Sequence, residues 1–289
     1  MDQVRDRSST VTLSINRVQN QKPGMSAIPL SDSDTLAVEE PLEIRLEYGA
    51  DHKRIKKSIS ITMRTPGHDF ELAVGFLFTE GILRDRKQLR NVQFCGPSGN
   101  VVRVEIQPEV DFDLKKLERH FYTSSSCGVC GKASIEALRI QSSYVGENGH
   151  LNQPQVSSQQ IHELPKRLRL HQGVFDATGG LHACAIFNTD GQLLQVREDV
   201  GRHNALDKLL GHYFLQNVMP LNQNILLVSG RASFELVQKA AMAGVKIFAA
   251  VGAPSSLAVE LAKESNMTLL GFVRDQRFNI YSGAERIIS

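Results

Sequence analysis

Cys127 and Cys130 are the residues of this sequence whose spacing most clearly indicates chemistry. A thiolate is the reactive form of cysteine, and the unpaired amides and dipole at a helix N-terminus stabilise it. A serine-rich segment precedes the two cysteines, and residues 132–140, which start with the cation Lys132, are expected to be helical. Cys130 can attack a group bound to Cys127, which suits a redox disulfide and equally the release of a persulfide sulfur. The residues alone therefore predict a reactive dithiol on a flexible loop.

Zinc binding is the alternative use of this pair. A structural zinc needs about four ligands, and the sequence has no second pair of cysteines at this spacing. His182 and Cys184 could complete a site only if their segment approached the loop of Cys127 and Cys130. We therefore predict that the protein holds no metal. Cys95 and Cys184 are expected in the core, because free cysteine is usually a small buried hydrophobe.

The bulk composition excludes several classes of protein. The 289 residues include 33 basic and 31 acidic side chains, a formal charge of +2, so nothing requires a nucleic acid or an anionic membrane as partner. No apolar stretch approaches the ~20 residues that span a bilayer. The first ten residues lack the apolar run of a signal peptide. These features predict a cytoplasmic protein in a reducing compartment, with no nucleic-acid or membrane partner.

The N-terminal half is expected to contain a tail, a small subdomain and a loop. Residues 1–40 are polar and are predicted to be a disordered tail. Residues 41–121 are predicted to form a small α+β subdomain, with a hairpin of alternating strands, a helix from about His68 to Gly81 and a further strand. Residues 122–156 are predicted to be the flexible loop of the two cysteines and its connection.

The C-terminal part, residues 157–289, is expected to be an α/β domain. A helix is predicted over 157–169, where Pro165 should kink or shorten it. Asp190-Gly191 indicates a hairpin, and beyond it helices alternate with short apolar strands, which predicts crossover units. The predicted fold class is α/β, with a mixed, largely parallel sheet in this domain and the smaller α+β subdomain before it.

Charged and polar side chains follow several of the predicted strands. Ligands of open α/β sheets bind where strands end and helices begin, backbone amides there hold phosphate, and paired arginines suit a pyrophosphate. Simpler roles stay open, because Asp199 could cap a helix and the arginines could be ordinary surface charge. The candidate ligand-binding residues at these junctions are Asp199, Arg202, His203, Ser229, Arg231, Arg274 and Arg277.

Five segments resemble the FdhD family, the sulfur carrier proteins needed for formate dehydrogenase activity. The resemblance covers roughly residues 40–289 and implies a cytidine-deaminase-like fold for the C-terminal domain. Deaminase activity is not expected, because it needs H-x-E followed by P-C-x-x-C, and His182-Ala183-Cys184 lacks the glutamate. The segments, in the family's order, are Cys-Gly-Val-Cys-Gly at 127–131, Thr-Gly-Gly-Leu-His at 178–182, Glu-Asp-Val-Gly-Arg-His-Asn-Ala-Leu-Asp-Lys at 198–208, Ser-Gly-Arg-Ala-Ser at 229–233 and Gly-Phe-Val-Arg at 271–274.

The resemblance also implies a role. Cys127 would carry sulfur from a cysteine desulfurase as a persulfide, with Cys130 assisting, and pass it to molybdenum bis(molybdopterin guanine dinucleotide), a bound substrate destined for formate dehydrogenase. The protein would be a homodimeric sulfurtransferase. The alternatives are a chaperone that binds the cofactor without transferring sulfur and, less favoured, a zinc-dependent hydrolase. The implied cofactor-binding stretch, which lacks the family's glycine before its last arginine, is Phe272, Val273, Arg274, Asp275, Gln276 and Arg277.

Overall fold

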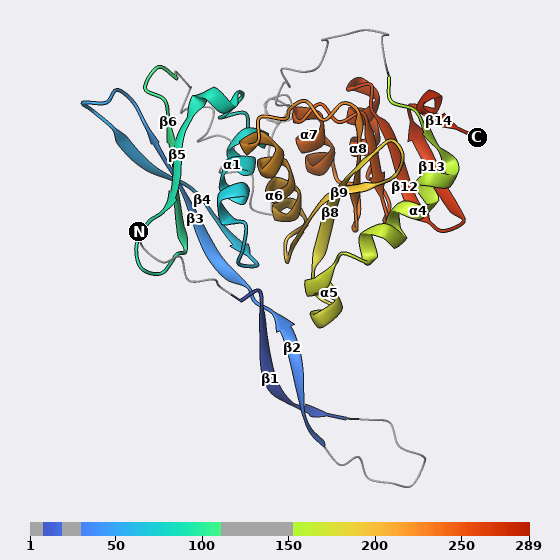
Figure 1. Cartoon of the computed structure of the whole chain (residues 1–289), viewed down its shortest axis with the longest axis horizontal. Coiled ribbons are helices and arrows are strands. Elements are labelled where there is room, and N and C mark those ends of the chain that lie inside the picture. The colour runs from blue at the N-terminus through green and yellow to red at the C-terminus, as the bar shows by residue number, and fades with distance from the viewer. Residues whose placement is uncertain (1–7, 19–29, 111–152) are drawn as a thin grey trace.

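The computed structural model describes residues 8–18, 30–110 and 153–289 (Figure 1). In this part of the chain, two main β-sheets lie on either side of a pair of packed helices. The N-terminal sheet has four strands and the C-terminal sheet has six. Cys127 and Cys130 lie outside the described residues, as do the predicted helix over 132–140 and most of the predicted loop over 122–156.

The four-stranded sheet confirms the alternation seen in the sequence. Leu42, Ile44 and Leu46 are fully buried on one face of β3, while the residues between them are only partly buried. Helix α1 follows β4, and Gly81, with a φ of 72°, takes the left-handed conformation that ends it. The elements of this unit, with sheet order β4-β3-β6-β5, are β3 (Glu40–Tyr48), β4 (Ile55–Arg64), α1 (Asp69–Thr79), β5 (Leu89–Phe94) and β6 (Val101–Ile106).

A β-hairpin occupies part of the predicted disordered tail. Strands β1 (Thr10–Arg17) and β2 (Leu30–Ala37) pair antiparallel and project away from the body of the molecule (Figure 1). The prediction of disorder over 1–40 was therefore wrong for these two strands. Apolar and polar side chains alternate from Val11 to Ile15, which is the period of a strand, but the high serine and aspartate content of the segment hid this signal.

The six-stranded sheet is mixed, in the order β13-β12-β11-β10-β8-β9. The pairs β10–β11 and β11–β12 are parallel, whereas β13–β12, β10–β8 and β8–β9 are antiparallel. The predicted mixed sheet is confirmed, but it is not largely parallel, because turns after β8 and β12 add the hairpin partners β9 and β13, and β8 also runs antiparallel to β10. The strands are β8 (His182–Asn188), β9 (Leu193–Asp199), β10 (Asn224–Val228), β11 (Ile247–Ala250), β12 (Thr268–Arg274) and β13 (Arg277–Ser282).

Helices cover both faces of this sheet (Figure 1). Cys184 and Ile186 of β8 belong to the core that includes α6, α7 and α8, whereas Ala185 and Phe187 pack in the layer that α4 covers. Pro165 lies inside α4 and does not end it, so of the two predicted effects, a kink or a shorter helix, the shortening does not occur. The helices are α4 (Ser158–Arg169), α5 (Gly173–Thr178), α6 (Arg202–Leu215), α7 (Phe234–Met242) and α8 (Ser256–Glu264), and the short strands β7 (Val156–Ser157) and β14 (Ile287–Ile288) pair beside them.

The predicted 41–121 subdomain shares its hydrophobic core with the C-terminal domain. Helices α1 and α6 cross with their backbones in contact. A Cβ on Gly75 would lie 1.9 Å from the carbonyl oxygen of Asp207, and one on Gly211 would lie 1.9 Å from that of Glu71. Any side chain at either glycine would force the helices apart. The two sheets are therefore joined through one helix pair. No helix in the described ranges is long and apolar enough to cross a membrane.

Candidate functional site

The ends of four strands meet at one edge of the six-stranded sheet, which we call the carboxyl edge. Strands β10, β11 and β12 are parallel, and β9 shares their direction because β8 runs antiparallel to both β9 and β10. Backbone hydrogen bonds join the residues after β10 and β11 and the end of β12, from Gly252 N to Gly230 O at 2.9 Å and from Phe272 N to Gly252 O at 3.1 Å. The three predicted ligand-binding segments therefore converge on this edge, as strand ends do in open sheets.

One group of basic and polar side chains lies where β8, β9 and β10 meet the carboxyl edge. Arg202 Nε is buried, and no atom of the described residues accepts a hydrogen bond from it. His203 Nε2 lies 2.8 Å from the exposed carboxylate of Glu235, Ser229 is half-buried and Arg231 is exposed. A buried donor without an acceptor carries a free-energy cost, so an anionic ligand that accepted this hydrogen bond would stabilise the site.

His182 belongs to the same group, although the sequence suggested it only as a zinc ligand. It begins β8 opposite Asp199, and a Cβ on Gly230 would lie 3.5 Å from its Nδ1. Burial, together with the charges of Arg202 and His203, lowers the pKa of His182 below its ordinary value, so the ring is neutral at pH 7. The sequence signal that could have indicated a ligand-binding role for His182 is its position, at the start of an apolar strand and directly after Gly179-Gly180-Leu181.

Asp199 supports the carboxyl edge from inside the protein. Its fully buried carboxylate lies 2.6 Å from Lys208 Nζ and accepts hydrogen bonds from Gly201 N at 2.9 Å and Thr65 N at 3.2 Å. Lys208, only 1% exposed, also donates to the carbonyl oxygen of Thr65 at 2.8 Å. Through these contacts Asp199 positions the backbone at Gly201 and at Thr65. Direct contact between Asp199 and a ligand stays a prediction. Lys208 is the last residue of the segment 198–208 that resembles the family, and the sequence pattern did not predict its contact with Asp199.

A second group of cations lies in the turn between β12 and β13. Arg274 and Arg277 face each other in register across this turn and are exposed, as are Asp275 and Gln276. Neighbouring strands lie about 4.8 Å apart, so the four steps from β12 to β9 place Arg202 and His203 about 19 Å from this turn, whereas Arg231, beyond β10, is two steps or about 10 Å away. The carboxyl edge is therefore long enough to contact two anionic groups at once.

Phe272 and Val273, which precede this turn, lie in very different environments. Phe272 has a φ of 54°, which is strained for a bulky side chain, and strained residues are often kept at functional sites. Val273 is fully buried in the core layer that α4 covers. The irregular register between Gly271 and Arg274 turns Val273 inward, so its side chain offers no surface to the predicted ligand.

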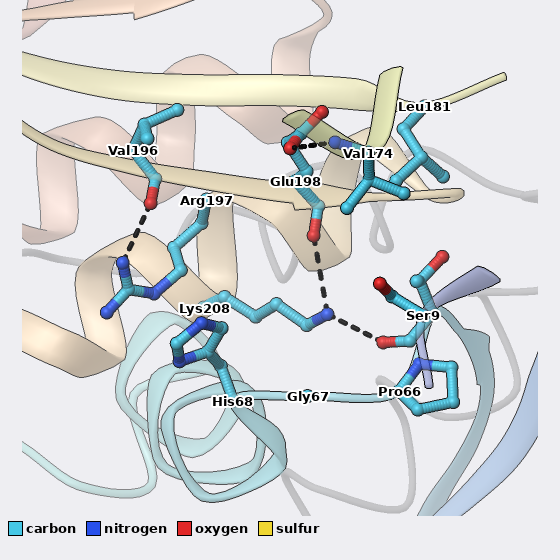
Figure 2. Close-up of a pocket in the computed structure, with 11 residues that line it drawn as sticks. Ser9, Pro66, Gly67, His68, Val174, Leu181, Val196, Arg197, Glu198 and Lys208 are labelled. Carbon is cyan, nitrogen blue, oxygen red and sulfur yellow. Dashed lines mark hydrogen bonds between the residues drawn. The ribbon is translucent and has the colours of Figure 1, made fainter. Parts of the chain in front are cut away.

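A separate cavity of about 280 Å³ opens beside the edge strand β9 (Figure 2). Its walls come from the turn at residues 65–68, from the start of α5, from β9 and from Lys208 of α6, and Ser9 at the base of the β1–β2 hairpin reaches it. No sequence pattern predicted this cavity, because its walls come from segments that are far apart in the chain.

The charged groups around the cavity are paired with one another. Arg197 donates from Nε and Nη2 to the two carboxylate oxygens of Glu71, at 2.5 Å and 2.7 Å, and His212 Nδ1 lies 2.9 Å from the same carboxylate. Burial is the largest single influence and would raise the pKa of Glu71, but the hydrogen bonds and charge of Arg197, together with the hydrogen bond from His212, outweigh it and hold that pKa below its ordinary value. Glu198 accepts hydrogen bonds from two backbone amides at the start of α5.

The described residues contain no group of three or more His, Cys, Asp or Glu side chains that could hold a metal ion. Cys184 is buried, as predicted, and burial raises the pKa of its thiol, which therefore stays protonated. Cys95 is partly exposed, so its predicted place in the core is wrong. Because Cys127 and Cys130 lie outside the described ranges, their chemistry and the absence of a bound metal stay predictions.

Comparison with known proteins gives consistent matches over most of the chain. The model of the FdhD/NarQ family matches residues 37–288. The sulfur carrier protein FdhD of Streptomyces coelicolor is 50% identical over 88% of this chain and 89% of that protein, and the one of Thermoplasma volcanium is 42% identical over 90% and 91%. A crystal structure of a formate dehydrogenase accessory protein from Desulfotalea psychrophila covers 97% of this chain and 100% of that one, with a TM-score of 0.70. At 24% identity that structure supports the fold alone.

Proposed function

The chain belongs to the FdhD/NarQ family, and from this premise we propose that it is a sulfur carrier that serves formate dehydrogenase. The observation that carries the proposal is the 50% identity, over 88% of the chain, with a protein named as a sulfur carrier. Cys127 and Cys130 supply the chemistry, because two thiols at this spacing can receive and release a sulfur atom.

In the proposed reaction, Cys127 accepts sulfur from a cysteine desulfurase. Its thiolate attacks the terminal sulfur of the donor's persulfide, an S–S bond forms on Cys127, and the donor's cysteine leaves as a thiolate. Attack of Cys130 on Cys127 Sγ then breaks this bond and releases hydrosulfide. The two thiols supply the two electrons and end as a disulfide, which a cellular dithiol reductant returns to the starting state. The protein is in this proposal a sulfurtransferase with a persulfide intermediate.

The sulfur acceptor in this proposal is molybdenum bis(molybdopterin guanine dinucleotide), bound as a substrate. Each of its two dinucleotide arms carries a pyrophosphate, which cations and backbone amides can hold. Arg202 and His203 would contact one arm and Arg274 and Arg277 the other, because about 19 Å separates these two pairs, with Arg231 between them at the end of β10. The buried Nε of Arg202 supports this assignment, since a phosphate oxygen would satisfy it.

Mass spectrometry after incubation with a cysteine desulfurase and cysteine tests the sulfur step. We expect one added sulfur atom on Cys127, and we expect Cys127→Ala to leave formate dehydrogenase inactive in cells that lack the protein. Cys184 is an internal control, because its buried thiol has a raised pKa. Added sulfur on Cys95 or Cys184 alone would contradict the proposal. An unmodified protein that still binds the cofactor would instead favour a chaperone without sulfur transfer.

We further propose that the protein is a cytoplasmic homodimer. Two-fold dimers are the commonest assembly of soluble proteins, and the projecting β1–β2 hairpin exposes Val11, Leu13 and Leu36, which a second copy could cover. Light scattering at micromolar protein concentration measures the assembly directly. The mass of a single chain in that experiment would count against this proposal.

A further inference from the structure

The turn between β12 and β13, which carries Arg274 and Arg277, is only partly fixed by its own strands. The strands pair at Gly271 with Asn279 and again at Arg274 with Arg277, and the register shifts between these pairs. Phe272, inside the shift, has a φ of 54°, which disfavours a bulky side chain. An irregularity of this kind disrupts the ladder of backbone hydrogen bonds. The direction of the two arginines therefore depends on contacts from outside the hairpin.

His162 of α4 supplies such a contact. Its Nδ1 lies 2.9 Å from the carbonyl oxygen of Arg274. A carbonyl oxygen only accepts hydrogen bonds, so Nδ1 carries the proton and donates it. The imidazole also packs against the ring of Phe278 in β13, with the ring centroids 5.0 Å apart. One side chain therefore contacts both strands of the hairpin, one on each side of the turn.

Both ends of this hydrogen bond are attached to the core. Ile161, which precedes His162 in α4, is fully buried, and so is Val273, which precedes Arg274 in β12. The two buried side chains belong to the same hydrophobic cluster. Protein interiors are close-packed and deform little. The distance between α4 and the backbone of Arg274 is therefore fixed from below, and His162 can hold the turn against a rigid support.

A second histidine shows how specific this arrangement is. His171, just beyond the end of α4, makes the same kind of bond, with its Nδ1 2.9 Å from the carbonyl oxygen of Arg167. That bond joins residues four positions apart within one turn of helix. The bond of His162 joins residues 112 positions apart. Of these two bonds, the one made by His162 links α4 to the cationic turn, and the one made by His171 serves as a matched comparison.

We propose that His162 is a positioning residue that holds the β12–β13 turn in the orientation in which Arg274 and Arg277 bind a phosphate group. It acts through the backbone of Arg274 and has no contact with the ligand in this proposal. A group that is already oriented loses less conformational freedom on binding, and exposed arginines gain most from such support. The phosphate as ligand rests on the function proposed above, whereas the contact of His162 with the turn does not.

Calorimetry with GDP on the full chain tests this role. His162→Phe keeps a ring against Phe278 but removes the donor, and it should weaken binding about fivefold, the effect of one lost neutral hydrogen bond. His162→Asn should bind GDP nearly as the parent does, because its amide nitrogen can occupy the place of Nδ1. His171→Phe is the control and should leave binding unchanged. Thermal melting of all three variants should resemble that of the parent, since His162 is only half-buried.

A double-mutant cycle separates positioning from a general loss of structure. In a protein with Arg274→Gln and Arg277→Gln, GDP can still bind through the group of Arg202, but the turn has no cation left to orient. His162→Phe should then cause no further loss of affinity, because its effect passes through the two arginines. Amide hydrogen exchange gives a readout without ligand, since residues 274–277 should exchange faster in His162→Phe than in His171→Phe.

Four results would overturn the inference: GDP binding by His162→Phe equal to that of the parent, the same loss in His162→Asn as in His162→Phe, a further loss in the background without the two arginines, or a large drop in melting temperature for His162→Phe. Undetectable GDP binding by the parent would instead refute the proposed cofactor site. Hydrogen exchange would still decide the role of His162 in that case, because unchanged exchange at residues 274–277 would refute the contact.

Discussion

Arg197 and Arg202 lie near the same end of the six-stranded sheet, yet their surroundings are opposite. Arg197 is 8% exposed and makes two hydrogen bonds to the carboxylate of Glu71. Arg202 has a buried Nε to which the described part of the chain offers no acceptor. The same residue type therefore holds the protein together beside the cavity and remains available for a ligand at the carboxyl edge.

Whether a cation has an acceptor within the protein distinguishes structural cations from ligand-binding cations better than its solvent exposure does. A buried ion pair contributes little net stability, but removal of one partner leaves an uncompensated charge. An arginine whose buried donor has no acceptor costs free energy on folding, and an anion that binds it removes that cost. The following predictions test this distinction, from the largest expected effect to the smallest.

Lys208→Met should lower the free energy of unfolding by about 3–5 kcal/mol, because it leaves the fully buried carboxylate of Asp199 without its counter-charge. Arg202→Met should instead raise it, by up to about 1–3 kcal/mol, because it removes a buried donor that has no acceptor. Urea denaturation measures both values. The double variant Asp199→Asn/Lys208→Met is the control and should recover part of the loss. Equal effects of the two single variants would remove the distinction.

Arg202→Gln should weaken the binding of GDP, a fragment of the proposed cofactor, about tenfold or more. A charge-assisted hydrogen bond is worth about 1.5–3 kcal/mol, and about 1.4 kcal/mol is a factor of ten. Arg274→Gln and Arg277→Gln should each weaken binding several-fold, because these side chains are exposed. Calorimetry compares them with Cys127→Ala, which should bind normally. Undetectable GDP binding by the parent protein would refute the assignment of this edge.

Acid should destabilise the protein through Glu71. Its pKa in the folded protein lies below the ordinary value of 4.5, so the unfolded chain binds the proton first as the pH falls. The stability that Glu71 contributes is complete above about pH 4.5 and is lost as the pH falls through the folded-state pKa. Glu71→Gln should therefore flatten the dependence of unfolding free energy on pH between about 5 and 3. An unchanged slope would show that Arg197 does not hold this carboxylate ionised.

His68→Gly should raise stability slightly, by up to ~1 kcal/mol, because His68 has a φ of 57°. The left-handed conformation costs a residue with a Cβ about 1–2 kcal/mol, and the greater freedom of glycine in the unfolded chain offsets part of the gain. Thermal melting checks this sign. A clear loss of stability would mean that the contacts of the imidazole, including that with Glu71, outweigh the backbone strain.

Much of the fold could be predicted because it depends on local patterns. The alternation in β3, the helix that ends at Gly81 and the hairpin at Asp190-Gly191 each follow from a few neighbouring residues. The convergence of three segments on the carboxyl edge also followed, since it depends on strand direction and order. The largely parallel sheet was wrong, because neither hairpin partner at its ends needs a crossover helix.

The remainder of the candidate site depends on contacts between distant segments. Asp199 at the end of β9 pairs with Lys208 inside α6, and both also form hydrogen bonds with the backbone of Thr65. Because Thr65 is far away in the sequence, no local pattern could predict these contacts. The cavity draws Ser9, His68 and Val174 together from three separate elements. The inward turn of Val273 follows from irregular pairing with β13, which has no pattern in the sequence.

The crossing of α1 and α6 at Gly75 and Gly211 also constrains the order of events during synthesis. Helix α1 ends at Thr79, but α6 begins at Arg202, so the ribosome needs on the order of ten seconds to deliver the second helix after the first. Through that interval the apolar face of α1 has no α6 to cover it. The nascent chain therefore exposes an aggregation-prone apolar surface early. A chaperone that binds this surface before α6 emerges should raise the yield of folded protein.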